Sequence, residues 1–479
     1  MNEKKMMNSQ KGKKNYNTAL EKRFTGQLIF HDEPGYEEAR VGRVFNARRP
    51  DRYPEAILLA ETETDLVEGV RLAMDRGWQV AVRSGGHSWA SWSVRDKSLL
   101  IDLGKYQETS YDETTGIVSA TPSVKGIDLD AFLATRGRFF PTGHCATVGI
   151  GGFLLQGGFG WNARGMGMSA EYIDAIDVVT AEGKLVRADA IQNSELFWAA
   201  RGAGPGFFGL VTRFHLQTIP RPKGITGSVY VYPMDLFDEV MTWLLETHKG
   251  ISSDVELAAT SRIYPEPIPG YEKEPVLIVS GVAFSETMNQ AKIALAPLAD
   301  FPQVDRALMR IEAKPTSIQQ LYDEDEFANP ENHRYIADCT WVEGPSEVVV
   351  PVIRDIFVTL PTPKSYSIWS SMAPLRELPD MAFSLLGENY VATYAIYEDE
   401  SNDEEFQNWI AQRMNRTEPV TIGQYLGDSD FTMRQVKFLD DTHWEKLQTI
   451  RNKWDPNRLF VGYLSKDEVP MNTNHWQHK

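Results

Sequence analysis

The chain has 479 residues, of which 42% are apolar and 24% charged, and its formal net charge is −17. This composition is that of an ordinary globular protein, and at roughly 100–200 residues per domain the length predicts several domains. The negative charge repels phosphate groups, which argues against a nucleic-acid partner. No apolar run approaches the ~18–20 residues that cross a bilayer, so we expect no membrane span.

Two cysteines, Cys145 and Cys339, are too few for a disulfide framework or a four-cysteine zinc site, and no metal site is predicted. The first 23 residues contain seven basic and two acidic residues and no apolar segment typical of a secretory signal. We therefore expect a solvated N-terminal tail and a cytoplasmic location.

The N-terminal part alternates between predicted strands and helices around a turn of small residues at 84–86. Apolar residues recur at helical spacing behind Thr64 and Asp65, which are the candidate caps, and Gly77 is the candidate end of that helix. The predicted elements are strands at 56–60, 79–83, 98–103 and 116–121, and helices at about 64–77 and 124–136.

The stretch 143–167 contains nine glycines, a density about five times the average usage, and such a segment needs tight turns or close backbone approach to a ligand. A hairpin at 172–189, a helix at 194–201 and a strand at 210–218 are predicted after it. From about 223 to 415, alternating strands and amphipathic helices predict an α+β layer whose sheet covers a pocket. A further helix is predicted at 442–454.

Two glycine motifs suggest a nucleotide-like ligand with different strength. Gly158, Gly160 and Ala163 match the dinucleotide pattern G-x-G-x-x-A, but no helix of the required length follows, so that site is not predicted. RSGGHS at 83–88 follows a strand, and its small residues allow backbone N–H groups to surround a pyrophosphate; a tight structural turn would use the same residues. His87 and Cys145, each taken alone, are typical of ordinary structural residues.

Taken together, four segments resemble in order and spacing the berberine bridge enzyme-like branch of the vanillyl-alcohol-oxidase type (PCMH-type) FAD oxidoreductases. These are RSGGHS at 83–88, GHCATVGIGGFLLQGGFGWNARG at 143–165, ELFWAARGAGPGFFGLVTRF at 195–214 and KWDPNRLF at 453–460. The resemblance implies an α+β fold with three parts. They are a PCMH-type FAD-binding domain at 24–222, an α/β substrate-binding domain with an antiparallel sheet at 223–415, and a C-terminal segment at 416–479 that returns to the first domain.

The resemblance also implies FAD held covalently at two points, with His87 bonded to the 8α carbon of the flavin and Cys145 to its C6 carbon. An imidazole nitrogen and a thiolate sulfur are nucleophiles able to add to an electron-poor ring. The other implied FAD contacts are Arg83, Ser84, Gly85, Gly86, Ser88, Thr147, Gly149, Gly152, Gly157, Gly160 and Val211.

The implied reaction transfers a hydride from a small-molecule alcohol, amine, phenolic or sugar substrate to the flavin, and then passes the electrons to molecular oxygen to give H2O2. Val148 matches the position that controls oxygen access in the family. Tyr425, in GQYLGDSD, matches the tyrosine that serves as the base, although Gly427 replaces the usual asparagine. Tyr425 as a packing residue, and Glu377 or Glu388 as the base, are alternatives.

The second domain offers an aromatic pocket wall, for which Trp369, Tyr390 and Tyr394 are the candidates. Two other functions remain open. One is a dehydrogenase of the same fold that uses another electron acceptor. The other is a flavin-free binding protein, against which the presence of both His87 and Cys145 argues.

Overall fold

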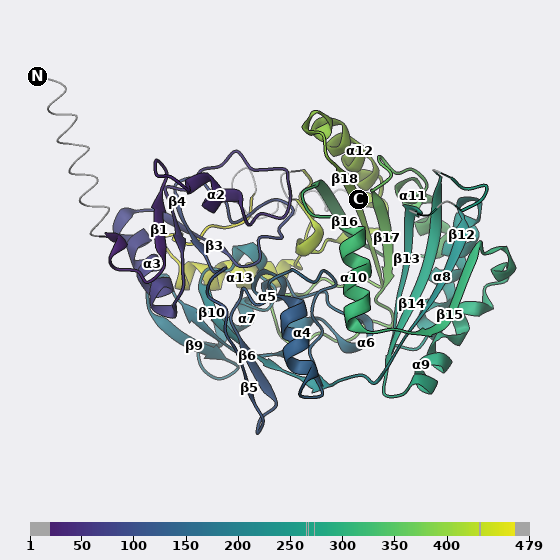
Figure 1. Cartoon of the computed structure of the whole chain (residues 1–479), viewed down its shortest axis with the longest axis horizontal. Helices are drawn as coiled ribbons and strands as arrows, with labels where there is room; N and C mark the ends of the chain where they lie inside the picture. Colours follow the sequence, from purple (N-terminus) through teal and green to yellow (C-terminus); the bar gives the residue numbers. More distant parts are fainter. Residues whose placement is uncertain (1–19, 265, 267, 273, 431–432, 465–479) are drawn as a thin grey trace, which may run out of the picture.

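The computed structural model describes residues 20–464, apart from 265, 267, 273 and 431–432. The predicted N-terminal tail lies, up to residue 19, outside the described residues. Figure 1 shows two regions side by side: N-terminal strands in purple and blue, joined by the yellow C-terminal helix, and a large green sheet. No helix in the described part of the chain is long and apolar enough to cross a membrane.

The first region begins with a four-stranded sheet in the order β1-β2-β4-β3, in which β2 and β3 run parallel to β4. Helix α3 connects β2 and β3. Its N-cap is Thr62 instead of the predicted Thr64 or Asp65, because Asp65 lies three residues into the helix and completes a capping box with Thr62. Gly77 ends the helix in the left-handed conformation, as predicted. The bounds are β1 Gln27–Phe30, β2 Ala56–Leu59, α3 Glu63–Arg76, β3 Gln79–Arg83 and β4 Ser98–Asp102.

A five-stranded antiparallel sheet in the order β5-β6-β10-β8-β9 follows in the same region. The predicted hairpin at 172–189 is β8 and β9, and the predicted helix at 124–136 is the shorter α4. The strands are β5 Thr109–Asp112, β6 Ile117–Ala120, β8 Ile173–Val179, β9 Leu185–Asp189 and β10 Leu210–Gln217; β7 Arg138–Phe139 pairs separately with β11 Ile219–Pro220. The helices are α2 Tyr36–Val41, α4 Gly126–Ala134, α5 Ile150–Leu155, α6 Ala163–Met166 and α7 Ser194–Ala199.

The C-terminal segment packs against this first region. Helix α13 (Asp441–Trp454) buries Trp444, Leu447 and Ile450 in the same core as α7. After the helix, the chain runs beside β3, where Val80 N donates to Leu459 O at 2.7 Å and Val461 N donates to Val80 O at 3.0 Å. Residues near both ends of the described chain therefore build one sheet edge, next to the RSGGHS loop.

The second region is an eight-stranded antiparallel sheet in the order β15-β12-β14-β13-β17-β18-β16-β19. Most of its helices pack on one face, and the other face lies toward the first region; α10 (Ile318–Ala328) instead packs between the sheet and the first region (Figure 1). The strands are β12 Gly224–Pro233, β13 Val255–Ile263, β14 Pro275–Ser285, β15 Met309–Pro315, β16 Arg334–Val342, β17 Tyr366–Ser371, β18 Asn389–Tyr397 and β19 Thr421–Gly423. The helices are α8 Phe237–Thr247, α9 Met288–Leu295, α10 Ile318–Ala328, α11 Ser346–Val358 and α12 Asp403–Arg416.

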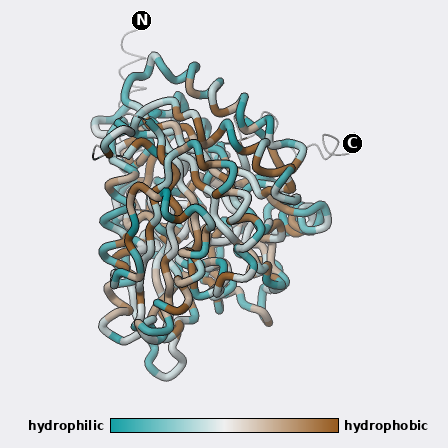
Figure 2. Tube along the Cα trace, turned by 90° about the vertical axis from the view of Figure 1, so that its right-hand side faces the viewer, coloured by the Kyte–Doolittle hydropathy of each residue, from teal (hydrophilic) through white to brown (hydrophobic). Residues whose placement is uncertain are grey.

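β19 pairs with β16, so the segment that follows residue 415 first adds a strand to this sheet and then returns to the first region. Every residue of β18 is buried because both faces of the sheet are covered. In Figure 2, hydrophobic segments run through the middle of the molecule and the outer turns are mostly hydrophilic.

Candidate active site

A cavity of about 540 Å3 lies where the glycine-rich loops of the first region meet the eight-stranded sheet. This volume is in the usual range for small-molecule and cofactor sites. From the first region, the cavity is lined by residues of the loop after β3, of the segment 143–159 and of β10. From the second region, it is lined by residues of β13, α10, β17 and β18 and of the segment 425–428.

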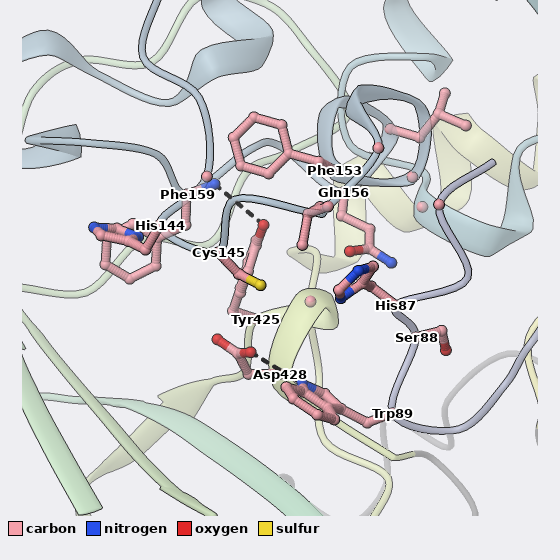
Figure 3. Close-up of a pocket in the computed structure, with 18 of the residues that line it drawn as sticks. His87, Ser88, Trp89, His144, Cys145, Phe153, Gln156, Phe159, Tyr425 and Asp428 are labelled. Carbon is pink, nitrogen blue, oxygen red and sulfur yellow. Dashed lines mark hydrogen bonds between the residues drawn. The ribbon is translucent and has the colours of Figure 1, made fainter. Parts of the chain in front are cut away.

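His87 projects into this cavity from the loop after β3 (Figure 3). The ring of Phe45 stacks on its imidazole at a centroid distance of 4.6 Å, and Thr147 Oγ1 lies 3.0 Å from His87 Nε2. Burial lowers the pKa of His87 to about 4, and the charge of Lys125 acts in the same direction. The imidazole is therefore neutral at pH 7, which is the form that can act as a nucleophile.

Cys145 approaches the same space from the glycine-rich segment (Figure 3). Its Sγ lies 3.7 Å from Thr147 Oγ1, so one hydroxyl group contacts both His87 and Cys145. Burial, together with the nearby Asp325, raises the pKa of the Cys145 thiol to about 12. The structure thus brings together the predicted attachment residues and Thr147.

The glycines of the two loops allow a close backbone contact and leave one face of the cavity open. A Cβ at Gly85 would lie 2.5 Å from Gly149 N, so the two loops can meet only because both residues lack side chains. Gly152 lines the cavity, and a Cβ there would meet no protein atom within 4 Å. Ser84, Gly86, Ser88, Val148 and Val211 also line the cavity. A cavity wall that is formed by glycine-rich backbone without projecting side chains fits a flat ring system with a phosphate chain.

Three of the predicted FAD contacts make close contacts within the protein itself. Gly157 and Gly160 are not among the described residues that line the cavity. A Cβ at Gly157 would meet the ring of Phe383, and one at Gly160 would meet a backbone carbonyl, so packing explains both glycines. Arg83 borders the cavity at the end of β3, but its guanidinium donates to Asp102 and to the backbone carbonyls of residues 39 and 40.

The sheet supplies the aromatic wall of the cavity. Tyr390 and Tyr394 line it as predicted, together with Tyr366, which stacks on Tyr394 at 4.6 Å. The prediction for Trp369 is wrong: it is fully buried on the helix-covered face, where its Nε1 donates to Asn389. Side chains alternate along a strand, so the positions of β17 that face the cavity are Tyr366, Ile368 and Ser370.

Tyr425 lines the cavity, and its hydroxyl accepts a hydrogen bond from Phe159 N at 3.1 Å (Figure 3). Burial raises the pKa of Tyr425 well above its ordinary value, so the phenol keeps its proton at neutral pH. Neither alternative base is among the described residues that line the cavity, and Glu388 Oε1 instead pairs with Lys249 Nζ at 2.6 Å.

Several polar residues of the cavity are not among the site residues predicted from the sequence. His144 Nε2 bonds to Glu256 Oε1 at 3.0 Å, and Glu256 raises the pKa of His144 above its ordinary value although burial opposes this. Asp428 accepts hydrogen bonds from Trp89 Nε1 and from the Tyr390 hydroxyl. Asp325 of α10 also lines the cavity. Glu256, Asp325 and Asp428 reach the site only through the packing of distant segments. Among the described residues, no group of three or more His, Cys, Asp or Glu side chains could hold a metal ion.

Comparisons with known proteins agree with this geometry. Residues 54–189 match the family model of an FAD binding domain. The FAD-linked oxidoreductase nodO of Hypoxylon pulicicidum is 37% identical over 434 residues, which cover 90% of this chain and 95% of that protein. The structure of Physcomitrella patens BBE-like 1 superposes with a TM-score of 0.78 at 22% identity, covering 93% of this chain and 97% of that one.

A third match is the crystal structure of an Acremonium strictum glucooligosaccharide oxidase, described as revealing a novel flavinylation. Its TM-score is 0.77 at 19% identity, and the match covers 93% of this chain and 96% of that one. The nodO match shows the family because it extends over nearly the whole of both chains. The two structural matches show the fold. The chain belongs to the FAD-linked oxidoreductases and has the PCMH-type fold of the berberine bridge enzyme-like proteins.

Proposed function

We propose that the protein is an oxidase that holds FAD covalently through His87 and Cys145 and oxidises a small-molecule alcohol, amine, phenol or sugar, with molecular oxygen as the final acceptor. The observation that carries this proposal is the convergence of His87 and Cys145 on one hydroxyl, Thr147 Oγ1, at the wall of one cavity. The chemistry that FAD supplies when bound is two-electron acceptance from a substrate carbon.

The protonation state of His87 supports the attachment. A neutral imidazole has a free nitrogen lone pair, and the lowered pKa of about 4 keeps the ring neutral across the physiological range. Phe45 stacks on one side of the ring and Thr147 holds its Nε2, so the ring is oriented without a charged partner. The fold match to an oxidase whose structure shows flavinylation is consistent with the same linkage here.

The cavity wall indicates the kind of substrate. Tyr366, Tyr390 and Tyr394 form an aromatic surface, and the His144–Glu256 pair adds a polar site next to Cys145. An apolar or ring-bearing body would lie on the tyrosines, while a hydroxyl or amine group would be held at the polar site. Tyr425 and Asp428 provide further hydrogen-bonding groups on the same side.

Retention of flavin tests the proposal directly. We expect the purified protein to be yellow and its flavin to stay with the polypeptide after acid precipitation. His87→Ala and Cys145→Ala should each leave one covalent linkage, and the double variant should release its flavin. Cys339→Ala, which removes the other thiol from a fully buried site, is the matched control and should keep both linkages. Flavin that leaves wild-type protein entirely on precipitation would refute the covalent proposal.

Oxygen use is tested separately. Val148 lines the cavity, and we expect a larger side chain at this position to hinder the approach of dioxygen. We expect peroxide release with at least one compound in a panel of amines, alcohols, phenols and oligosaccharides. Val148→Leu should slow reoxidation of the reduced flavin in stopped-flow experiments in air. Equal reoxidation rates would remove Val148 from this role, and turnover only with an artificial acceptor would identify a dehydrogenase.

A further inference from the structure

We propose that Asp325 is the base that accepts the proton of the Cys145 thiol when this cysteine forms its bond to the flavin ring. The inference rests on the proposed function, because it concerns the second covalent linkage. It adds a catalytic residue for cofactor attachment in a helix of the second region that the sequence motifs do not reach.

The position of Asp325 is fixed by contacts on both sides. One turn earlier in α10, the Tyr322 hydroxyl bonds to Thr142 Oγ1 at 2.6 Å, which ties the helix to the segment that carries Cys145. One turn later, Asn329 Nδ2 donates to Asp325 Oδ1 at 3.1 Å, and Asn329 Oδ1 accepts from the Tyr366 hydroxyl at 2.9 Å. The carboxylate is therefore held at the cavity wall by one of its two oxygens.

The other oxygen, Asp325 Oδ2, is buried and has no hydrogen-bond partner among the described residues. A buried carboxylate oxygen without a donor is costly, and such an atom in a cavity marks a place where a proton or donor is accepted during function. Cys145 and Asp325 line the same cavity, and each group shifts the pKa of the other.

The thiol needs such a base. With a pKa of about 12, about one molecule in 10⁵ carries the reactive thiolate at pH 7. Burial raises the pKa of Asp325 above the ordinary carboxyl value, although His144 opposes this, and the higher pKa makes Asp325 a stronger base. The titratable or charged groups that interact with Asp325 are His144, Cys145, Arg262, Tyr335, Tyr366 and Asp428.

The other polar neighbours of the thiol do not replace Asp325. Thr147 Oγ1, 3.7 Å from the sulfur, can accept a hydrogen bond but not a proton at neutral pH. His144 uses its Nε2 for the hydrogen bond to Glu256 Oε1 at 3.0 Å, so this nitrogen is already occupied by another partner. Of these three groups in the described part of the chain, Asp325 is the one with a buried oxygen, Oδ2, that has no hydrogen-bond partner.

The S–H bond of Cys145 breaks and its proton passes to Asp325 Oδ2, while the sulfur forms a bond to C6 of the flavin ring. The hydrogen at C6 leaves as a proton, and the two electrons released pass to dioxygen. With the two protons, dioxygen becomes hydrogen peroxide.

The test follows the two linkages separately by mass spectrometry of the proteolytic peptides that contain His87 and Cys145, in protein freshly loaded with FAD in air. Asp325→Asn should attach FAD through His87 as the wild type does and modify Cys145 at least ~10²-fold more slowly, the usual effect of losing a general base. The residual rate should rise about tenfold per pH unit, since the thiolate must form without help. Asp323→Asn, at an exposed position of the same helix, is the matched control and should behave as wild type.

Two further variants guard against a folding defect. Asp325→Glu should restore much of the Cys145 linkage, and added formate should restore it in Asp325→Ala by entering the space that the side chain leaves. If Asp325→Asn, or Asp325→Ala without formate, forms the Cys145 linkage at the wild-type rate, Asp325 is not the base. If wild-type protein carries FAD on His87 but none on Cys145, the second linkage of the proposed function fails, and this assignment fails with it.

Discussion

The sequence motif predicts that Arg83 contacts FAD, whereas its side-chain contacts in the structure predict a role in stability. As part of RSGGHS it resembles an FAD contact, yet the residue is only 2% exposed. Its guanidinium donates hydrogen bonds to Asp102, to Arg40 O at 2.6 Å and to Ala39 O. Arg83→Met keeps the apolar stem and removes the charge. Removing one partner of a buried ion pair costs about 3–5 kcal/mol. Asp102 still accepts from Arg43 and from Gly104 N, so we expect a loss of about 3 kcal/mol.

The assay is denaturant unfolding followed by tryptophan fluorescence, together with thermal melting. A loss of about 3 kcal/mol corresponds to a fall in Tm of roughly 6–12 °C for a domain of this size. Arg416→Met removes an exposed arginine paired with Asp355 and should change stability little. The reasoning is refuted if Arg83→Met unfolds at the wild-type denaturant concentration and temperature but loses FAD, because Arg83 would then be a cofactor contact.

Three further predictions concern other parts of the site and the core. Gly85→Ala should destabilise the fold, since its Cβ would lie 2.5 Å from Gly149 N. Gly152→Ala should instead leave folding intact and lower FAD occupancy, because its methyl group enters the cavity. Melting curves measure the first effect and flavin absorbance the second. Burial lowers the pKa of His248 to about 4. As the pH falls from about 6.5 to 4, this histidine therefore binds a proton in the unfolded state before it does so in the folded state. The free energy of unfolding should drop by up to about 3 kcal/mol over that window. His248→Gln should flatten this pH dependence, and an unchanged slope would contradict the buried neutral state. The phenol of Tyr425 keeps its proton at neutral pH, so if Tyr425 is the substrate base, kcat should rise with pH beyond 9. Tyr425→Phe should remove that rise. A pH-independent kcat in the wild type would leave Tyr425 as a packing group.

The elements that the sequence predicts well are those whose pattern is local. The strand before RSGGHS, the turn that follows it and the C-terminal helix at 441–454 depend on apolar spacing and on turn residues within a few positions. The register of β17 is a different case, because Trp369 and Tyr366 are both aromatic and only the packing of helices on one face decides which of them reaches the cavity. Asp325 lies 180 residues from Cys145 in sequence, and no local signal distinguishes it from the other acidic residues of α10.

The division of the cavity between the two regions explains why motifs identify the cofactor site but not the substrate. The residues predicted to hold FAD come from continuous glycine-rich loops, where backbone approach fixes the residue type at Gly85 and Gly149. Residues that face the rest of the cavity come from β13, β17 and β18 and from α10, where any side chain compatible with a strand or helix fits the fold. Substitutions such as Tyr394 to a smaller residue can therefore change the substrate without disturbing the loops that bind the cofactor. Asp325 is the exception in this second region: because it lines the same cavity as Cys145 and is the base that we propose for its thiol, replacing it should alter cofactor attachment as well as the cavity wall.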